Sequence, residues 1–291
     1  MRRWIILFFL LFVILNPSHA EENTIVSSNQ NLTPPAEMYS ALEGIIEEIY
    51  DEFAVIGSEN QVSAKSLQDT GISGDEANSV LLAKISNITH GNSSLIVSPE
   101  NIITAAAPAG YEDLIGTDLS HQPETRFANE KKEPVISNLF YLEEGFYGIS
   151  VSYPVFSKED EYLGYTDVTI RPEELIRTVI SPFMEDTGYE VMIVQTDGMI
   201  IYDEDEIEIG KNTLTDPVYD TSEMKSSSET LLENETGVIS QYTFWDKNWR
   251  KQVSRQAIWD TLFLDNQEWR VVIIRNLEAD GEELNVTLED N

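Results

Sequence analysis

The chain has 291 residues, with 52 Asp and Glu against 18 Lys and Arg, and its formal net charge at pH 7 is −34. This charge excludes a nucleic-acid-binding function, because a protein that binds phosphates needs a basic face. The absence of cysteine excludes disulfides, thiol catalysis, and zinc or iron–sulfur sites held by Cys. Hydrophobic residues make up 41% of the chain, which is sufficient for a packed core.

The first twenty residues have the pattern of an export signal. Arg2 and Arg3 precede an apolar run over residues 4–15, and a short polar segment ends at Ala20. Small residues at the −3 and −1 positions predict cleavage after Ala20, whereas an uncleaved anchor is the alternative. The apolar run is shorter than the ~20 residues of a spanning helix, so we expect a secreted or cell-envelope protein. Five Asn-x-Ser/Thr sequences fit an exported glycoprotein: Asn31, Asn87, Asn92, Asn234 and Asn285.

A long helix is predicted over residues 34–70, after a polar and flexible leader over residues 21–33. Thr33 can cap this helix, and Pro34 suits its first turn. Apolar residues recur at spacings of three and four, so they form one stripe along the helix. The stripe consists of Met38, Leu42, Ile45, Ile49, Phe53 and Ile56.

Residues 71–186 predict a first α+β module, in which strand patterns are separated by Gly- and Pro-containing turns. Its first elements are a helix over 74–85 and a hairpin of strands over 95–98 and 102–107. A helical insert within 108–132 precedes strands over 135–142, 147–156 and 162–170, and Arg171-Pro172 begins another helix.

Residues 187–277 repeat this plan, and Thr196-Asp197-Gly198 is a strong hairpin signal within them. The expected elements are strands over 189–195 and 199–202, helical segments within 203–233, and strands over 237–245, 252–264 and 269–275. Each module is therefore expected to form a five-stranded antiparallel sheet with a helical insert, and the long N-terminal helix to brace both. An acidic tail over residues 278–291 follows.

Catalytic patterns are missing from the sequence. No HExxH, GxSxG, phosphate-loop or GxGxxG pattern occurs, and the three His are isolated. We therefore expect a protein that is not an enzyme and that needs no cofactor. The acidic run from Asp203 to Glu206 has oxygens that suit calcium, but it lacks the glycine and the spacing of a calcium loop. We expect a solvated acidic turn there and no metal site.

Several motifs carry a family resemblance. They are the glycine before the aspartate in GTDLS, the hairpin PVFS…EYLG, the TDG turn of the second module, and a Trp near the end of the chain. With the stretches 110–141, 147–170, 189–212 and 268–276, this layout resembles the tandem PAS-like extracellular sensors called double-Cache domains, over roughly residues 35–277. The resemblance implies that the first module is distal to a membrane and holds a ligand between its sheet and its helical insert.

Amino-acid-binding members of this family carry an arginine for the ligand carboxylate and an aspartate on the fifth strand for the amine. Arg126 and Asp167 match these two positions. Guanidinium–carboxylate and carboxylate–ammonium pairing supports both roles. Ala128 and Asn129 replace an aromatic pair of the family motif, and Phe140 lies near its tyrosine position.

We therefore expect Arg126 and Asp167 to face one cavity, with Tyr111, Phe140 and Tyr147 in its walls. The alternative is a structural Arg126–Asp167 salt bridge that closes the insert onto the sheet.

The resemblance implies an extracellular sensor module that binds a small polar or anionic molecule, such as an amino acid or a carboxylate. Such a module would pass its signal to a separate membrane receptor or kinase. The alternative is a structural or adhesive cell-envelope glycoprotein with the same fold and no ligand. A closed, apolar-filled first module would favour that alternative.

Overall fold

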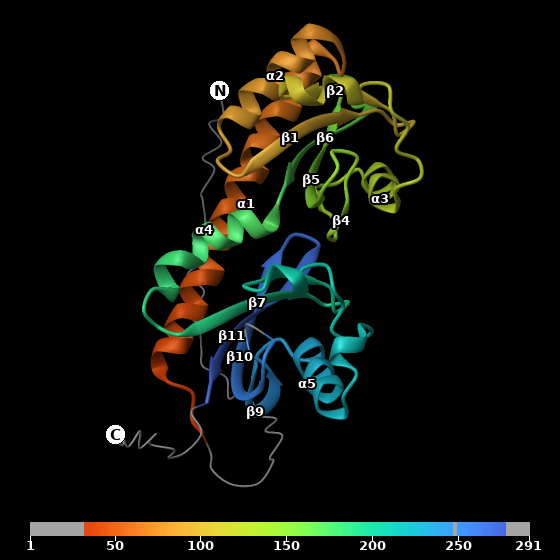
Figure 1. Cartoon of the computed structure of the whole chain (residues 1–291). Helices are drawn as coiled ribbons and strands as arrows, with labels where there is room; N and C mark the ends of the chain where they lie inside the picture. Colours follow the sequence, from red (N-terminus) through yellow and green to blue (C-terminus); the bar gives the residue numbers. More distant parts are fainter. Residues whose placement is uncertain (1–31, 247–248, 278–291) are drawn as a thin grey trace, which may run out of the picture.

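The computed structural model describes residues 32–246 and 249–277, which form two α+β modules along one long helix (Figure 1). This helix is α1 (Ala36–Thr70). Among the described residues, no helix is both long and apolar enough to cross a membrane. The predicted export signal, most of the leader and the acidic tail lie outside the described residues.

The predicted apolar stripe of α1 is buried along its whole length, and the burial continues beyond it to Asn60, Ala64 and Leu67. The helix packs against strands of both sheets, which confirms the expected brace. Its first residue follows Pro35, and no side chain caps it, so the expected cap by Thr33 is wrong.

The first sheet has the order β2-β1-β6-β5-β3, and β4 also pairs with β5. Its strands are β1 (Gly91–Val97), β2 (Ile103–Ala107), β3 (Val135–Ile136), β4 (Phe140–Tyr141), β5 (Tyr147–Phe156) and β6 (Tyr162–Ile170), all antiparallel.

The predicted single strand over residues 135–142 is wrong, because it is divided into β3 and β4. Between them the backbone turns to the second module, where Leu139 N donates to Gln195 Oε1 over 3.0 Å. This sheet therefore has six strands instead of five.

Helices cover both faces of the first sheet. α1 and α2 (Gly74–Ser86) pack on one face, and α3 (Pro123–Lys131) lies on the other (Figure 1). The insert also contains the 3-10 helix η1 (Ala109–Leu114). This arrangement leaves a space between α3 and the sheet.

The second sheet has the order β8-β7-β11-β10-β9, which is the same relative order as in the first module. The predicted repeat is thus confirmed. Its strands are β7 (Tyr189–Gln195), β8 (Ile200–Asp203), β9 (Gly237–Trp245), β10 (Gln252–Leu264) and β11 (Gln267–Asn276). Its helices are α4 (Pro172–Met184), which links the modules, η2 (Glu206–Glu208), η3 (Pro217–Tyr219) and α5 (Ser222–Glu233).

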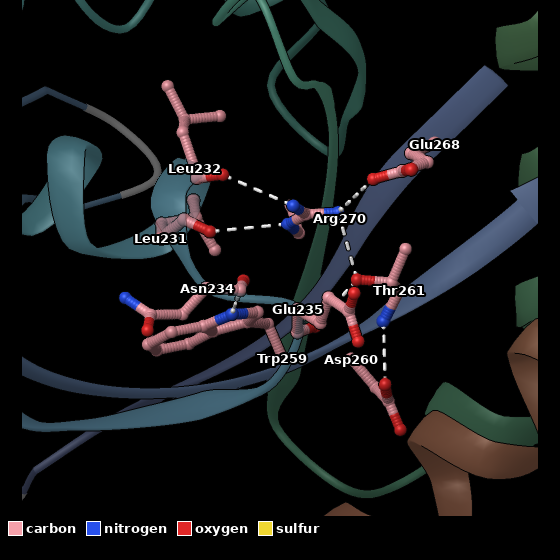
Figure 2. Close-up of polar contacts among 9 residues, drawn as sticks. All are labelled: Leu231, Leu232, Asn234, Glu235, Trp259, Asp260, Thr261, Glu268 and Arg270. Carbon is pink, nitrogen blue, oxygen red and sulfur yellow. Dashed lines mark hydrogen bonds and ion pairs between the residues drawn. The ribbon is translucent and has the colours of Figure 1, made fainter. Parts of the chain in front are cut away.

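A buried arginine fastens α5 to the second sheet (Figure 2). Arg270 of β11 donates from Nε to the Leu231 carbonyl over 3.3 Å and from Nη2 to the Leu232 carbonyl over 3.1 Å. Its Nη1 donates to Thr261 Oγ1 over 2.9 Å. Carbonyls in the last turn of a helix lack partners within the helix, and a cation there also suits the helix dipole. Arg270 therefore holds the C-terminal end of α5 in place.

The two modules are joined by a clasp of side-chain amides, formed by Asn266 and Gln267 on the edge strand β3. Ile136 N donates to Asn266 Oδ1 over 2.8 Å, and Asn266 Nδ2 donates to the Ile136 carbonyl over 3.0 Å. Gln267 Nε2 donates to the same carbonyl over 2.9 Å. The side-chain amides bond to the backbone groups of β3 that a neighbouring strand would otherwise pair with. The turn between β10 and β11 thus covers this edge of the first sheet.

Candidate functional site

A polar cavity lies between the first sheet and its helical insert, with an empty volume of about 410 Å³ including its opening. The sheet forms its floor, and α3 together with the segment 137–144 forms its walls. The lining residues are Leu95, Leu119, Gln122, Glu124, Thr125, Ala128, Val135, Ser137, Phe140, Leu142, Glu143, Glu144, Ser150, Ser152, Tyr165, Asp167 and Thr169.

Strand alternation explains the polar floor. Side chains two residues apart share one face of a strand, so Tyr165, Asp167 and Thr169 of β6 all line the cavity. On β5, Ser150 and Ser152 do the same, and Ser152 lies directly opposite Asp167. The intervening residues are apolar or bond toward the helices, so the two faces of this sheet differ sharply in polarity.

Asp167 lies at the centre of this floor and is 3% exposed. Its Oδ1 accepts from Leu95 N and its Oδ2 from Ser150 Oγ, both over 2.8 Å. Burial, together with the charge of Glu144, raises the pKa of Asp167 to about 6. A buried carboxylate with a raised pKa is stabilised in its charged form by any cation that enters the cavity.

A buried lysine lies behind the floor. Lys84 of α2 is 1% exposed, and its Nζ donates to Asn60 Oδ1 over 2.8 Å, and to Thr166 Oγ1 and the Asp167 carbonyl over 2.7 Å each. These three acceptors use all three ammonium donors. Burial lowers the pKa of Lys84 to about 7, although the carboxylates of Asp167 and Glu59 oppose the shift.

The cavity lining is acidic. It contains Glu124, Glu143, Glu144 and Asp167, and no Lys or Arg of the described chain is part of it. Glu144 Oε1 accepts from Ser93 Oγ over 2.6 Å. At the wall, Glu143 is 2.9 Å from Nε2 of His121, which connects the segment before α3 to the wall segment. The arrangement suits a ligand with a positively charged group.

The structure brings together only two of the five sequence-predicted site residues. Asp167 and Phe140 line the cavity. Arg126 is exposed, does not line the cavity, and donates to the Ser120 carbonyl. Tyr147 is 57% exposed and packs edge-to-face on Tyr141, and Tyr111 packs beside the apolar cluster under the insert.

The two positions that replace the family's aromatic pair have structural roles here. Ala128 packs under α3 and lines the cavity. Asn129 Nδ2 donates to the Ser98 carbonyl over 3.0 Å and to Asn101 Oδ1 over 2.8 Å. Its Oδ1 accepts from Tyr162 Oη over 2.7 Å. Asn129 thus ties α3 to the β1–β2 turn and to β6.

Sequence reasoning missed the serines of β5 and the buried Lys84. A signal for the serines was present, since Ser150 and Ser152 alternate with Ile149 and Val151 on a predicted strand. Polar residues at every second position indicate a polar face. Lys84 gave no comparable signal, because one lysine on a helix is usually solvated.

The first residue of the acidic run differs from expectation. Asp203 is the last residue of β8 and, together with Glu208, lines a cavity of the second module. Burial raises the pKa of Asp203 to about 7. Among the residues that the structure describes, no group of three or more His, Asp or Glu is placed to hold a metal ion.

Comparison with known proteins agrees with this architecture. Residues 52–172 match the model of the family described as HK/GC/Chemotaxis protein-like, sensor domain. No curated protein sequence matches the chain.

Solved structures share the fold across most of the chain. An extracellular ligand binding receptor from Desulfohalobium retbaense DSM5692 has a TM-score of 0.71 and 23% identity, over 84% of this chain and 41% of that one. The chain therefore spans less than half of that receptor's structure.

Two chemoreceptor ligand-binding domains are also similar. The ligand-binding domain of Pseudomonas fluorescens chemoreceptor CtaA, in complex with L-alanine, has a TM-score of 0.59 and 12% identity, over 84% of this chain and 98% of that one. The domain of Pseudomonas aeruginosa PAO1 chemoreceptor PctB, in complex with L-Gln, gives the same TM-score and identity, over 84% and 91%. The predicted resemblance to tandem Cache-type sensor domains is thus confirmed.

Proposed function

We propose that this chain is an extracellular sensor module whose first module binds a small molecule through an ammonium group. The observation that carries the proposal is the Asp167 carboxylate at the floor of an acidic cavity between sheet and insert. An ammonium placed there would form a charge-assisted hydrogen bond with a desolvated carboxylate. The similar chemoreceptor domains in complex with L-alanine and L-Gln support a small amine-bearing ligand.

The same lining argues against the anionic ligand that the sequence left open. Four acidic residues and no basic residue of the described chain line the cavity, so a ligand carboxylate would meet repulsion and only neutral hydroxyl and amide donors. Arg126, which was expected to bind a carboxylate, lies on the outer face of α3. We therefore favour an amine without a carboxylate over a free amino acid.

A matched ligand series tests the proposal. L-alaninamide, L-alanine, L-lactamide and propionate differ in their ammonium and carboxylate groups, and each is titrated into the mature protein by calorimetry and by thermal shift. We expect L-alaninamide to stabilise the protein most, because it has the ammonium group and lacks the carboxylate. A ligand at 100 times its Kd adds about 2.7 kcal/mol to the free energy of unfolding. L-lactamide, which lacks the ammonium, is expected to give no shift.

The variant Asp167→Asn keeps the size of the side chain and the acceptor for Leu95 N, and removes the charge. Its new amide nitrogen donates to Ser150 Oγ, where the carboxylate accepted. We expect it to lose the response to L-alaninamide, whereas Asp186→Asn, an exposed aspartate in a turn, is expected to keep it. A wild-type response to propionate but not to L-alaninamide would contradict the ammonium site. No response to any small molecule would favour a structural or adhesive role without a ligand.

We also propose that the module acts through a separate membrane receptor or kinase. Its structural neighbours include the extracellular domain of a putative histidine kinase and chemoreceptor domains, which supports this partner class. Crosslinking of the protein to membranes of its own cells, with and without L-alaninamide, tests the proposal. Ligand-dependent capture of a receptor or kinase is the expected result, and an unchanged set of crosslinked proteins would contradict it.

Export with cleavage after Ala20 is part of the same proposal, because the ligand would be met outside the cell. Intact-mass analysis of the native protein is expected to show residue 21 at the N-terminus. A native chain that begins at Met1 and stays with membranes would contradict it.

A further inference from the structure

The second module contains a larger cavity, between α5 and the second sheet, with an empty volume of about 590 Å³ including its opening. Its body is apolar. The lining residues are Met192, Tyr219, Met224, Leu231, Ile239, Tyr242, Phe244, Ala257, Trp259, Val272 and Ile274, with Asp203, Glu208, Thr213, Ser227 and Ser228 as the polar members. An apolar body with a few polar groups is the usual composition of small-molecule sites.

The walls of this cavity are fixed by contacts on both sides. Arg270 holds the C-terminal end of α5, and Trp259 Nε1 donates to the Asn234 carbonyl just beyond that helix over 3.0 Å (Figure 2). Gly237 allows the Trp259 ring to lie close to β9, because a Cβ at this position would be 2.2 Å from the ring. The indole face is thus a rigid apolar wall and not a mobile side chain.

Two carboxyl groups line the cavity, those of Glu208 and of the partly buried Asp203. Glu208 is 5% exposed, and its Oε2 accepts from Tyr219 Oη. Burial and the charge of Asp203 raise the pKa of Glu208 to about 8. Burial likewise raises the pKa of Asp203.

Other charged groups face this pair from neighbouring elements. Glu190 of β7 and Asp205 add negative charge, and Lys211 and Arg255 add positive charge. Arg255 is itself held by Glu190, at 3.2 Å between Nη1 and Oε2. Among the described residues that line the cavity, none is a Lys or Arg that could pair with Asp203 and Glu208.

A third polar group points to a ligand independently of the acids. Thr213 is 3% exposed and lines the cavity, and its Oγ1 has no hydrogen-bond partner in the structure. A buried hydroxyl without a partner costs free energy, so such groups are usually satisfied by a neighbour, by water or by a ligand. Here an occupant of the cavity would supply the missing partner.

We propose that this cavity is a second ligand site, which binds an apolar molecule with a primary amine. The apolar part would lie among Trp259, Tyr242 and Leu231, and the ammonium would lie between Asp203 and Glu208, within reach of Thr213. This site is in a different module from the ligand site proposed above and differs from it in character, since the first cavity has a polar floor and the second an apolar body. Neither proposal depends on the other.

The test uses 2-phenylethylamine, with 2-phenylethanol and phenylacetate as neutral and anionic matches, titrated calorimetrically into the mature protein. We expect the amine to bind at least tenfold more tightly than the alcohol, and phenylacetate not to bind. The amine is also expected to bind more tightly at about pH 8.5 than at about pH 6, because Asp203 and Glu208 gain charge in between. Equal affinity of all three compounds, or no binding of the amine, would overturn the proposal.

Variants locate the bound amine. Glu208→Gln and Thr213→Val are expected to weaken its binding at least tenfold and at least twofold, respectively, whereas Glu229→Gln, an exposed acid on α5, is expected to have no effect. Ser227→Phe, at a partly exposed position, is expected to fill the cavity and abolish binding while the protein stays folded by circular dichroism. Loss of binding in Asp167→Asn, with Glu208→Gln unchanged, would place the amine in the first cavity and overturn this proposal.

Discussion

The ammonium of Lys84 and the carboxylate of Asp167 lie on opposite faces of β6, since Lys84 donates to the side chain of the adjacent Thr166. The Asp167 side chain turns to the cavity, because Thr166, its neighbour on the strand, turns to Lys84. The lysine thus contributes to the electrostatics of the carboxylate without occupying its hydrogen-bonding sites. This geometry leaves the cavity side of Asp167 open to a ligand.

We predict that Lys84→Met destabilises the protein by about 3 kcal/mol or more, because the buried acceptors Asn60, Thr166 and Asp167 lose their donor. Denaturant melts measure this change. Lys65→Met, at an exposed position on α1, is the matched control and is expected to stay within about 0.5 kcal/mol of wild type. Equal effects of the two substitutions would show that the buried network contributes little.

Arg270→Met is predicted to cost about 3 kcal/mol, since the carbonyls at the end of α5 and the hydroxyl of Thr261 lose a buried charged donor. Hydrogen exchange of α5 is expected to accelerate. The ion pair of Arg270 with Glu268, at 3.6 Å, is half exposed on the Glu side. Glu268→Gln is therefore expected to change stability by less than about 1 kcal/mol. A larger loss for Glu268→Gln than for Arg270→Met would refute the role assigned to the carbonyl contacts.

The two acids that line the cavity of the second module predict an unusual pH dependence. Asp203 and Glu208 have pKa values of about 7 and about 8 in the folded protein, above their ordinary values. The folded state therefore binds more protons than the unfolded state, and stability falls as the pH rises from about 4 to about 8. The double variant Asp203→Asn with Glu208→Gln is expected to flatten this part of the curve. Denaturant melts across this pH range check the slope, and an equally steep fall in the variant would assign it to other groups.

Asn266→Ala is predicted to destabilise the protein by about 1 kcal/mol, because the two hydrogen bonds between Asn266 and Ile136 are lost. The amide of Ile136 is expected to exchange faster with solvent. Asp265→Asn, at the neighbouring exposed position with positive φ, is the control and is expected to leave that amide protected. Unchanged protection in Asn266→Ala would mean that the Ile136 amide needs no acceptor from Asn266.

Much of the fold could be predicted because its long strands alternate cleanly. The predicted strands 147–156, 162–170, 189–195, 237–245 and 252–264 agree with the structure at both ends. The prediction of one strand over 135–142 was wrong because the backbone of this segment bonds to residues of the other module. A local sequence pattern does not show such long-range contacts.

The site was harder to predict than the fold. Thr125, Ala128 and Asn129 form the buried face of α3 at spacings of three and four, which leaves Arg126 on the outside. Arg126 therefore does not line the cavity that contains Asp167. Asp167 was predicted from the family resemblance, and it lines the cavity. Its role in binding a ligand stays a prediction.

The clasp between Asn266 and Ile136 has a thermodynamic consequence. The segment that follows Ile136 forms a wall of the first cavity, so an occupant that displaces this wall must work against contacts of the second module. Consider a molecule that binds the second module and strengthens the clasp. It would change the affinity of the first cavity for its ligand by a certain factor, and that ligand would change the affinity of the second module for the molecule by the same factor. The affinity of each cavity is measured with and without the molecule that binds the other module. The two ratios are expected to be equal, and in Asn266→Ala both ratios are expected to approach one.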